Sequence, residues 1–314
     1  MSSTSTPTPV TERIERLNRA SARRVIDPDV ELPGSVGDGQ ILPDDLLSIH
    51  GLDLDLSPEQ RRTLGREEVA SIFDNGVRFE AVLEAGFALQ VYRTHDLTDP
   101  RVTFLLHEMG EETRHQRLFQ RLITQIQPQA VNPFVGSWIL ARLDRLGVGW
   151  VINHLPLLYV MVLAGEEIPD LMQKMAAEHP DTDPFLVTLS RYHRQEEARH
   201  LSYARAMLPE IWAEASAVER NVVRHLAPAI ITQMFTFLVH PGVYEVVGLP
   251  GWATWKQVNA LPERIAIRHA ATRNVLAALL EGGVLSAGRL PKQWQTLCGV
   301  DRSGAPLAGA GLGL

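Results

Sequence analysis

Two copies of the string Glu-Glu-x-Arg-His are the residues with which this chain is best equipped to do chemistry. They occupy 111–115 and 196–200, and in each copy the second glutamate and the histidine are three residues apart. Side chains at that spacing project from one face of a helix, and carboxylate oxygens and imidazole nitrogens together suit iron or manganese. The strings therefore predict two halves of one metal site. The ligands that they predict are Glu112, His115, Glu197 and His200.

A bundle site for two metals also needs a lone inward-facing glutamate from each of two further helices. Glu80 lies 32 residues before Glu112, and Glu166 lies 31 residues before Glu197. Both glutamates lie on apolar stretches, where a carboxylate is costly unless it is paired or binds a cation. Glu84, one turn beyond Glu80, is an alternative, but the 28-residue spacing that it gives matches the second half less well.

His193 adds a third imidazole to this set. It lies four residues before Glu197 and seven before His200, so the three side chains share one helix face. Other polar residues near the two strings are interpreted as a solvated face or as partners that orient the ligands. These are Glu111, Arg114, Glu196 and Arg199. A core or supporting role is favoured for His107, Glu108 and His154.

Carboxylates and imidazoles without cysteine favour two iron ions, Fe2+ or Fe3+, over zinc, whose structural sites depend on cysteine. Manganese or a mixed manganese–iron pair is an alternative. The single cysteine, Cys298, excludes an internal disulfide framework and a self-contained iron–sulfur cluster. It is typical of a protein in a reducing cytoplasm.

Helices must position these residues, and the sequence indicates where they begin. Ser57 is a predicted helix cap, with Pro58 in the first turn and Gln60 as the third helical residue. The predicted helices span 57 to about 95, 101–126, 133–146, 149–178 and 185–206, and two or three more fill 209–239 and 262–281. Pro156 and Pro169 are predicted kinks in the helix over 149–178.

Strand patterns are nearly absent, and no linker separates the central helices. We therefore predict an all-α fold with a four-helix bundle at its core and additional helices around it. The prolines, glycines and aspartates of DPDVELPGSVGDG predict a flexible or wrapping, irregular N-terminal segment over residues 1–56. Residues 57–298 form the predicted single helical domain, and 299–314 form a C-terminal tail.

The composition excludes several partners. The 314 residues are 45% apolar and carry a net charge of −7 with no basic cluster, which argues against nucleic acid or an anionic membrane as the main partner. The most apolar run, LPLLYVMVLAG at 155–165, is too short to span a bilayer, and the polar N-terminus is not a secretory signal. We expect a cytoplasmic protein, for which a homodimer is a possible assembly.

At these residues the chain resembles the ferritin-like diiron proteins, and most of all the p-aminobenzoate N-oxygenase (AurF-type) family. The resemblance covers roughly residues 57–240 and rests on FEAVLEAGF, EETRH, LAGEE and HRQEEARH. The family's distinguishing mark is an additional histidine in His-x-x-x-Glu-x-x-His, which the segment from His193 to His200 reproduces. The ligands implied by the resemblance are Glu80, Glu112, His115, Glu166, His193, Glu197 and His200.

The resemblance implies a non-haem diiron oxygenase that oxidises an (aryl)amine nitrogen to hydroxylamine, nitroso or nitro through a peroxo-diferric intermediate. It implies a small-molecule amine and O2 as substrates. The chain has no dinucleotide-binding motif and no cysteine cluster, so electrons must come from an external donor or reductase. A diiron C–H hydroxylase or an acyl desaturase is the alternative. A core role is favoured over a pocket role for Phe73, Phe87, Tyr159 and Met161.

Overall fold

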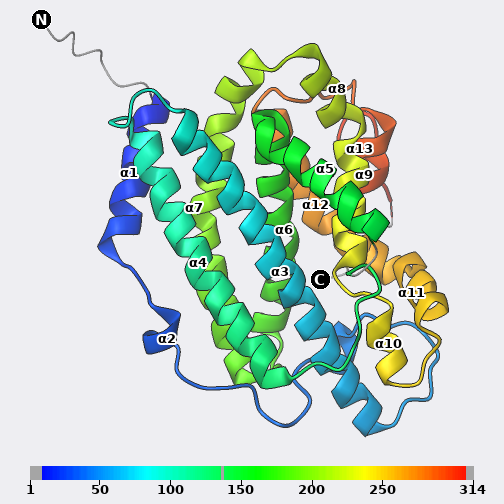
Figure 1. The fold of residues 1–314 in the computed structure, drawn as a ribbon. Coiled ribbons are helices and arrows are strands. Elements are labelled where there is room, and N and C mark those ends of the chain that lie inside the picture. The colour runs from blue at the N-terminus through cyan, green and yellow to red at the C-terminus, as the bar shows by residue number, and fades with distance from the viewer. Residues whose placement is uncertain (1–8, 136–137, 309–314) are drawn as a thin grey trace, which may run out of the picture.

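Residues 9–135 and 138–308 are described by the computed structural model, and they form a mostly helical molecule (Figure 1). The four longest helices are α3 (Pro58–Arg93), α4 (Pro100–Ile126), α6 (Leu155–Glu178) and α7 (Pro184–Glu214). α3 packs along α4 and α6 packs along α7, and each pair contacts the other. The predicted all-α fold with a four-helix bundle core is confirmed.

Three of the four bundle helices begin with a polar cap followed by a proline. The Ser57 hydroxyl accepts a hydrogen bond from the Gln60 N–H at 3.2 Å, and the Gln60 side chain accepts one from the Ser57 N–H at 2.9 Å. Asp99 and Asp183 cap α4 and α7 through their side-chain oxygens. These caps satisfy N–H groups that a helix start leaves free, and a proline there has no N–H to satisfy.

The remaining helices surround the bundle. α1 (Pro9–Arg23) lies along α4 and α7, whereas α12 (Pro262–Glu281) lies along α6. The others are α2 (Pro28–Glu31), the short 3-10 helix η1 (Asp44–Leu46), α5 (Trp138–Asn153), α8 (Ala217–His225), α9 (Ala227–Phe237), α10 (Gly242–Val246), α11 (Gly251–Ala260) and α13 (Lys292–Cys298). In Figure 1, α8, α9 and α13 gather at the upper right, and α10 and α11 lie at the lower right.

The predicted boundary between the helices over 133–146 and 149–178 is wrong. α5 continues to Asn153, α6 begins at Leu155, and the two helices are bent by 108° at the break. Pro156 therefore lies in the first turn of α6, where a proline is tolerated, and it is not a kink. The break lies directly before Pro156, which has no N–H to continue the hydrogen bonds of α5 and whose ring would clash with the preceding turn.

Part of the N-terminal segment differs from the prediction of a flexible or wrapping chain. Val10, Ile14 and Leu17 are spaced for one face of a helix, and α1 packs that face against the apolar core of the bundle. Ile14 is fully buried there. The segment after α1 is largely irregular. The division of the chain into segment, domain and tail stays a prediction.

Two apolar layers enclose a polar layer at mid-height of the bundle. On α3, Glu80 lies between the buried Phe73 and Leu83, which belong to different apolar clusters. On α4, Leu105 and Leu118 flank the first Glu-Glu-x-Arg-His string in the same manner. The polar layer is therefore closed off on both sides by packed hydrocarbon, which lowers the local dielectric constant and strengthens electrostatic interactions within it.

α3 and α6 approach each other closely at Gly165, the residue before Glu166. A Cβ atom at this position would overlap the ring of Phe79, which is the residue before Glu80. Any larger residue would force the two helices apart, since the overlapping atoms belong to a packed aromatic ring. Gly165 thus fixes the distance between the two helices that carry the lone glutamates.

α6 is the most apolar helix of the bundle, and every residue from Pro156 to Ile168 is buried. Among the described helices, none taken singly has both the length and the apolar composition needed to cross a bilayer. Two bent pairs satisfy those criteria only when their members are joined, namely the end of α5 with α6, and α8 with the segment 227–246.

Candidate metal centre

The bundle brings all seven predicted ligands together in the polar layer. Glu80 comes from α3, Glu112 and His115 from α4, and Glu166 from α6, and α7 supplies the other three. None of the seven is more than 3% exposed. Their side-chain donor atoms form overlapping groups in which all atoms lie within 4.8 Å of one another. These groups are Glu80–His115–His193, Glu112–His115–Glu197, Glu166–His193–Glu197 and, with one further glutamate, Glu108–Glu112–His200.

Glu112 and Glu197 lie between two histidines. The Nδ1 atom of His115 is 3.3 Å from a Glu112 oxygen and 3.1 Å from a Glu197 oxygen. The Nδ1 atom of His200 is 2.9 Å from the other Glu197 oxygen and 3.3 Å from the other Glu112 oxygen. Each of these carboxylates therefore faces both histidines, which is the arrangement that a carboxylate bridging two cations would need.

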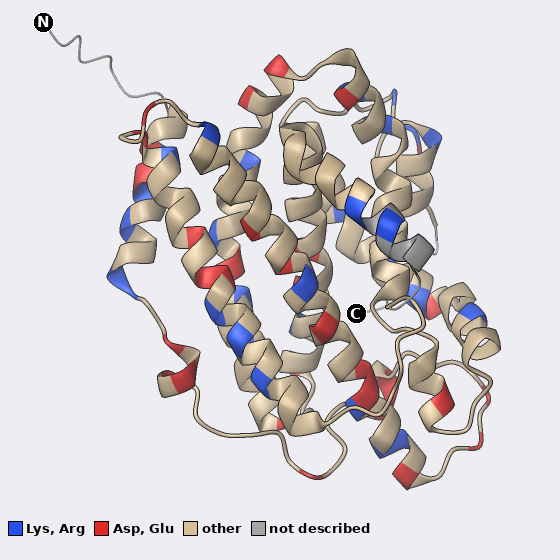
Figure 2. Cartoon of the chain, viewed as in Figure 1, with Lys and Arg blue, Asp and Glu red and all other residues tan. Residues whose placement is uncertain are grey.

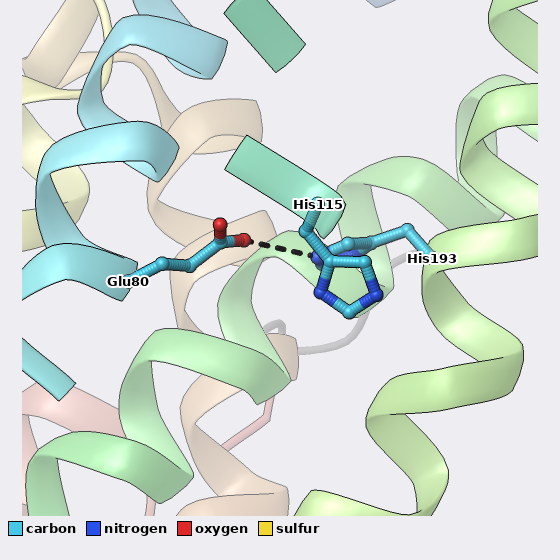
Figure 3. A group of neighbouring side chains, drawn as sticks. All are labelled: Glu80, His115 and His193. Atoms are coloured by element: carbon cyan, nitrogen blue, oxygen red, sulfur yellow. Dashed lines mark hydrogen bonds and ion pairs between the residues drawn. The ribbon is translucent and has the colours of Figure 1, made fainter. Parts of the chain in front are cut away.

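His193 faces the same centre from the opposite nitrogen. Its Nε2 atom lies 3.4 Å from Glu80, the interaction drawn in Figure 3, and 3.4 Å from Glu197. Its Nδ1 atom pairs with the side-chain oxygen of Gln173 at 2.9 Å. When Nδ1–H donates to Gln173, the Nε2 lone pair is free for a cation. Gln173 is a supporting residue that the sequence did not indicate.

The first glutamate of each string serves the histidine of the other string. Glu196 accepts from Nε2 of His115 at 3.0 Å, and Glu111 accepts from Nε2 of His200 at 2.9 Å. Each bond holds the proton on Nε2, so that Nδ1 presents its lone pair to the centre. The exchange explains why the whole pentapeptide, and not only Glu-x-x-His, occurs twice.

The arginine of the second string connects the two glutamates. Arg199 lies 2.9 Å from Glu111 and 3.2 Å from Glu196, whereas Arg114 is 4.0 Å from Glu196. The pKa of Glu111 is lowered to about 2 by His200 and Arg199 although burial opposes the shift, and the pKa of Glu196 is also lowered. Both glutamates are therefore ionised acceptors, as a histidine that binds a metal requires of its partner.

Burial and mutual repulsion dominate the electrostatics of the inner groups. The acidic positions of α4 lie at mid-height of the bundle (Figure 2). Burial, reinforced by neighbouring carboxylates, raises the pKa of Glu80 and of Glu166 well above the usual value. Burial lowers the pKa of His193 to about 4. Burial would also raise the pKa of Glu197, but His200 and His193 hold it well below the usual range.

The donor atoms fit a pair of divalent cations. Each of the four carboxylates has one buried oxygen that accepts no well-aligned hydrogen bond, namely Oε2 of Glu80, Oε1 of Glu112, Oε1 of Glu166 and Oε1 of Glu197. The oxygens of Glu112 and Glu197 instead lie beside the Nδ1 atoms of His200 and His115, the atoms that would share a cation with them. Buried acceptors are almost always satisfied, because an unsatisfied one costs about 1–3 kcal/mol. Four such oxygens in one layer, beside three imidazoles, make a cation site the economical explanation.

Glu108 is a member of the polar layer for which sequence reasoning favoured only a core or supporting role. It is 1% exposed, and one of its oxygens groups with Glu112 and His200 within 4.8 Å. Its Oε2 atom has no hydrogen-bond partner, and burial raises its pKa to about 8. The sequence could have indicated that Glu108 faces the centre, because Glu108 precedes Glu112 by four residues just as His193 precedes Glu197.

Glu84, the alternative to Glu80, lies outside the centre. It accepts a hydrogen bond from Thr113 at 2.7 Å and is partly exposed. His154 stacks on Trp150 with ring centroids 3.9 Å apart, at the break before α6. Neither Glu84 nor His154 belongs to a group of donor atoms in the described part of the chain.

Comparison with known proteins agrees with this geometry. The family model described as P-aminobenzoate N-oxygenase AurF matches residues 8–283, which include all four bundle helices. An uncharacterised protein of Mycobacterium tuberculosis strain H37Rv is 27% identical over 248 residues, which cover 73% of this chain and 69% of the relative. Uncharacterised proteins of Mycobacterium bovis and of M. tuberculosis strain CDC 1551 have the same identity and coverage.

Proposed function

The chain belongs to the p-aminobenzoate N-oxygenase AurF family, and on that premise we propose that it oxidises the nitrogen of a small arylamine with O2. Membership makes it a non-haem diiron oxygenase, which is an oxidoreductase that uses O2 and acts on a small molecule. The proposed products are the hydroxylamine, the nitroso compound or the nitro compound. The proposal is about nitrogen as the atom oxidised and about an arylamine as the substrate.

We propose two iron ions, held in the polar layer by residues from all four bundle helices. The proposed ligands are Glu80, Glu112, His115, Glu166, His193, Glu197 and His200. The observation that carries this proposal is the set of four buried carboxylate oxygens that accept no well-aligned hydrogen bond, beside three imidazoles and between two apolar layers. Manganese in one position is compatible with the same donor set.

When bound, two iron(II) ions supply electrons for the reduction of O2. The chain itself holds the imidazole protons in place and keeps bulk water out of the site. Glu111 and Glu196 keep the Nε2 protons of His200 and His115, and Gln173 accepts the Nδ1 proton of His193. These bonds orient three imidazoles before a cation arrives, which lowers the cost of ordering them. Burial of the layer excludes bulk water, which limits side reactions of activated oxygen.

Electrons for repeated turnover are proposed to come from an external donor. The only cysteine, Cys298, is buried among α12 and α13 and has no second cysteine with which to cycle. Reduced ferredoxins and flavin reductases are suitable donor classes for an assay. An unspecific chemical reductant is the control that separates a missing donor from a missing activity.

The proposal is tested by loading the protein anaerobically with Fe2+, removing free metal, and measuring metal per chain by elemental analysis. The loaded protein is then mixed with ¹⁸O2, a reductant and a panel of arylamines, and the products are analysed by mass spectrometry. We expect two irons per chain and ¹⁸O on the nitrogen of at least one arylamine. Glu84→Ala is the matched control and is expected to keep the full metal content.

Two outcomes would contradict different parts of the proposal. Less than one iron per chain in the loaded protein would remove the metal centre itself. Two irons with ¹⁸O on carbon, or with loss of hydrogen from an acyl chain, would keep the centre and replace N-oxygenation by C–H hydroxylation or desaturation.

A further inference from the structure

Two tyrosines of α7 lie next to proposed metal ligands. Tyr192 directly precedes His193, and Tyr203 follows His200 by three residues. Both are buried, with 5% and 1% of their surface exposed. A phenol can give up one electron to a strong oxidant, and the oxidised phenol then releases its hydroxyl proton readily. Whether either tyrosine can do so beside an O2-activating centre depends on the group that would take the proton.

Tyr192 lies between a metal ligand and a charged carboxylate. Its ring meets the imidazole of His115 edge to face, with ring centroids 5.6 Å apart. Its hydroxyl makes no well-aligned hydrogen bond in the described part of the chain, although a buried phenol usually has one. The hydroxyl is nevertheless close to Glu196, because the pKa of Glu196 is lowered by the hydrogen bond from His115 and also by Tyr192.

Glu196 is suited to take the proton of this phenol. Its carboxylate accepts from Nε2 of His115 at 3.0 Å and lies 3.2 Å from Arg199 and 4.0 Å from Arg114. These neighbours hold it as an anion. Loss of an electron alone would leave a positive charge on the buried ring of Tyr192, and an unpaired buried charge is very costly. The proton must therefore leave with the electron, and Glu196 is the adjacent base.

Tyr192 also lies close to the surface of the molecule. Arg114, one of the charged groups that act on it, has a side chain that is 16% exposed, and the preceding residue, Arg191, is exposed. A small reductant in solution can therefore come within about one side chain of the Tyr192 ring. The ring thus connects the ligand His115 on its inner side with solvent on its outer side.

Tyr203 does not have these surroundings. Its ring stacks on Phe104 with centroids 4.0 Å apart, inside the apolar core. Its hydroxyl interacts with that of Tyr159, which donates its own proton to Gln90 at 3.1 Å. A neutral phenol is a far weaker base than a carboxylate. Tyr159 itself lies in the core, as the sequence favoured, and so do Phe87 and Met161.

We propose that Tyr192 is a one-electron relay that protects the protein when O2 has oxidised the metal pair and no amine is bound. The O–H bond of Tyr192 breaks. Its electron passes through His115 to the oxidised metal pair, which is reduced by one electron, and its proton passes to Glu196. A soluble one-electron donor of the ascorbate class then reduces the tyrosyl radical, which takes the proton back. The inference rests on the metal centre of the proposed function, but not on the arylamine.

The test mixes the iron(II)-loaded protein with O2 in the absence of amine and freezes samples over milliseconds to seconds. Electron paramagnetic resonance counts organic radicals, and a chelator measures the iron(II) that remains. We expect a radical whose spectrum narrows when the protein contains ring-deuterated tyrosine. Tyr192→Phe lacks the hydroxyl and should lower the radical yield at least about tenfold. Tyr203→Phe makes the same change near the other histidine and should keep the yield within about twofold.

A second pair of variants tests the proton acceptor and does not depend on the folding of Tyr192→Phe. Glu196→Gln should lower the radical yield per bound iron about fivefold or more, because an amide cannot take up the proton. Glu111→Gln is the matched control, since Glu111 holds His200 as Glu196 holds His115. Its yield per bound iron should stay within about twofold of wild type.

The outcomes separate this inference from the proposed function. Oxidised iron without a radical in wild type, or a radical that Tyr192→Phe leaves unchanged, would overturn the relay and keep the metal centre. Equal yields in Glu196→Gln and Glu111→Gln would overturn the role of Glu196. Less than one iron per chain would remove both the relay and the proposed function. A Tyr192 radical in a protein that oxidises no arylamine would keep the relay and remove the N-oxygenase proposal.

Discussion

The two halves of the bundle, α3 with α4 and α6 with α7, use one pattern for metal binding and differ at one register. Four residues before the second glutamate of the string, the first half has Glu108 and the second half has His193. Burial shifts both residues toward the uncharged form, raising the pKa of Glu108 to about 8 and lowering that of His193 to about 4. The low dielectric of the layer thus acts on both positions in the same sense.

The surroundings of the two positions differ. His193 is held by Gln173, which lines a cavity bounded by α3, α6 and α12. Glu108 lies on the side of the packed core, where Phe104 stacks on Tyr203 with ring centroids 4.0 Å apart. The duplicated part of the pattern therefore supplies the predicted metal ligands and their partners. Of the two residues at the diverging position, His193 is held by a residue that lines a cavity of about 100 Å³ among the residues that the structure describes.

The largest expected effect tests whether the halves bind metal as equals. Glu112→Ala and Glu197→Ala, one in each half, are each expected to weaken iron binding by at least about a hundredfold. The reason is that each carboxylate faces both His115 and His200. Metal titration followed by elemental analysis measures this. A variant that still holds two irons tightly would show that the halves are not equivalent.

The exchanged hydrogen bonds provide the next test. Glu111→Ala and Glu196→Ala should each lower metal affinity about 10- to 100-fold, since each removes the acceptor that orients the histidine of the other half. Glu111→Gln and Glu196→Gln keep an acceptor oxygen and should recover part of the loss. If only one of the two alanine variants loses metal affinity, the hydrogen bond removed by the other variant does not contribute to metal binding.

Gly165 and Phe79 occupy equivalent positions in the two halves, each directly before a lone glutamate. Gly165→Ala is expected to lower the free energy of unfolding by about 1–3 kcal/mol, because the added Cβ overlaps the Phe79 ring. Thermal unfolding followed by circular dichroism measures it. Gly110→Ala in α4 is the control: its Cβ would meet nothing nearer than 3.7 Å, so a gain of about 0.5–1 kcal/mol is expected. A stable Gly165→Ala protein would rule out the tight contact.

The smallest expected effects concern Glu108 and His193, which occupy the equivalent position at which the two halves differ. His193→Ala should reduce iron affinity by about tenfold, because six proposed ligands remain to hold the metals, while Glu108→Ala should change it less than about threefold. Both variants are compared by metal titration under the same conditions. A loss of iron in Glu108→Ala as large as that in His193→Ala would make Glu108 an eighth ligand and restore the equivalence of the halves.

The sequence by itself predicted the helical bundle and seven of the residues that the bundle gathers in its polar layer. Helix periodicity is local, so Glu112 and His115 share a face wherever the helix is placed. The matched spacing to Glu80 favoured it over Glu84, and the structure places Glu80 within the cluster and Glu84 outside it. The starts of α3 and α4 could also be predicted from the sequence, because a capping residue and a proline determine a helix start within one turn.

Only the tertiary structure decided which side chains meet across helices. The hydrogen bonds from His115 to Glu196 and from His200 to Glu111, and the support of His193 by Gln173, all depend on how the bundle helices are aligned. Local periodicity fixes the face on which a residue lies, but long-range packing fixes what that face meets.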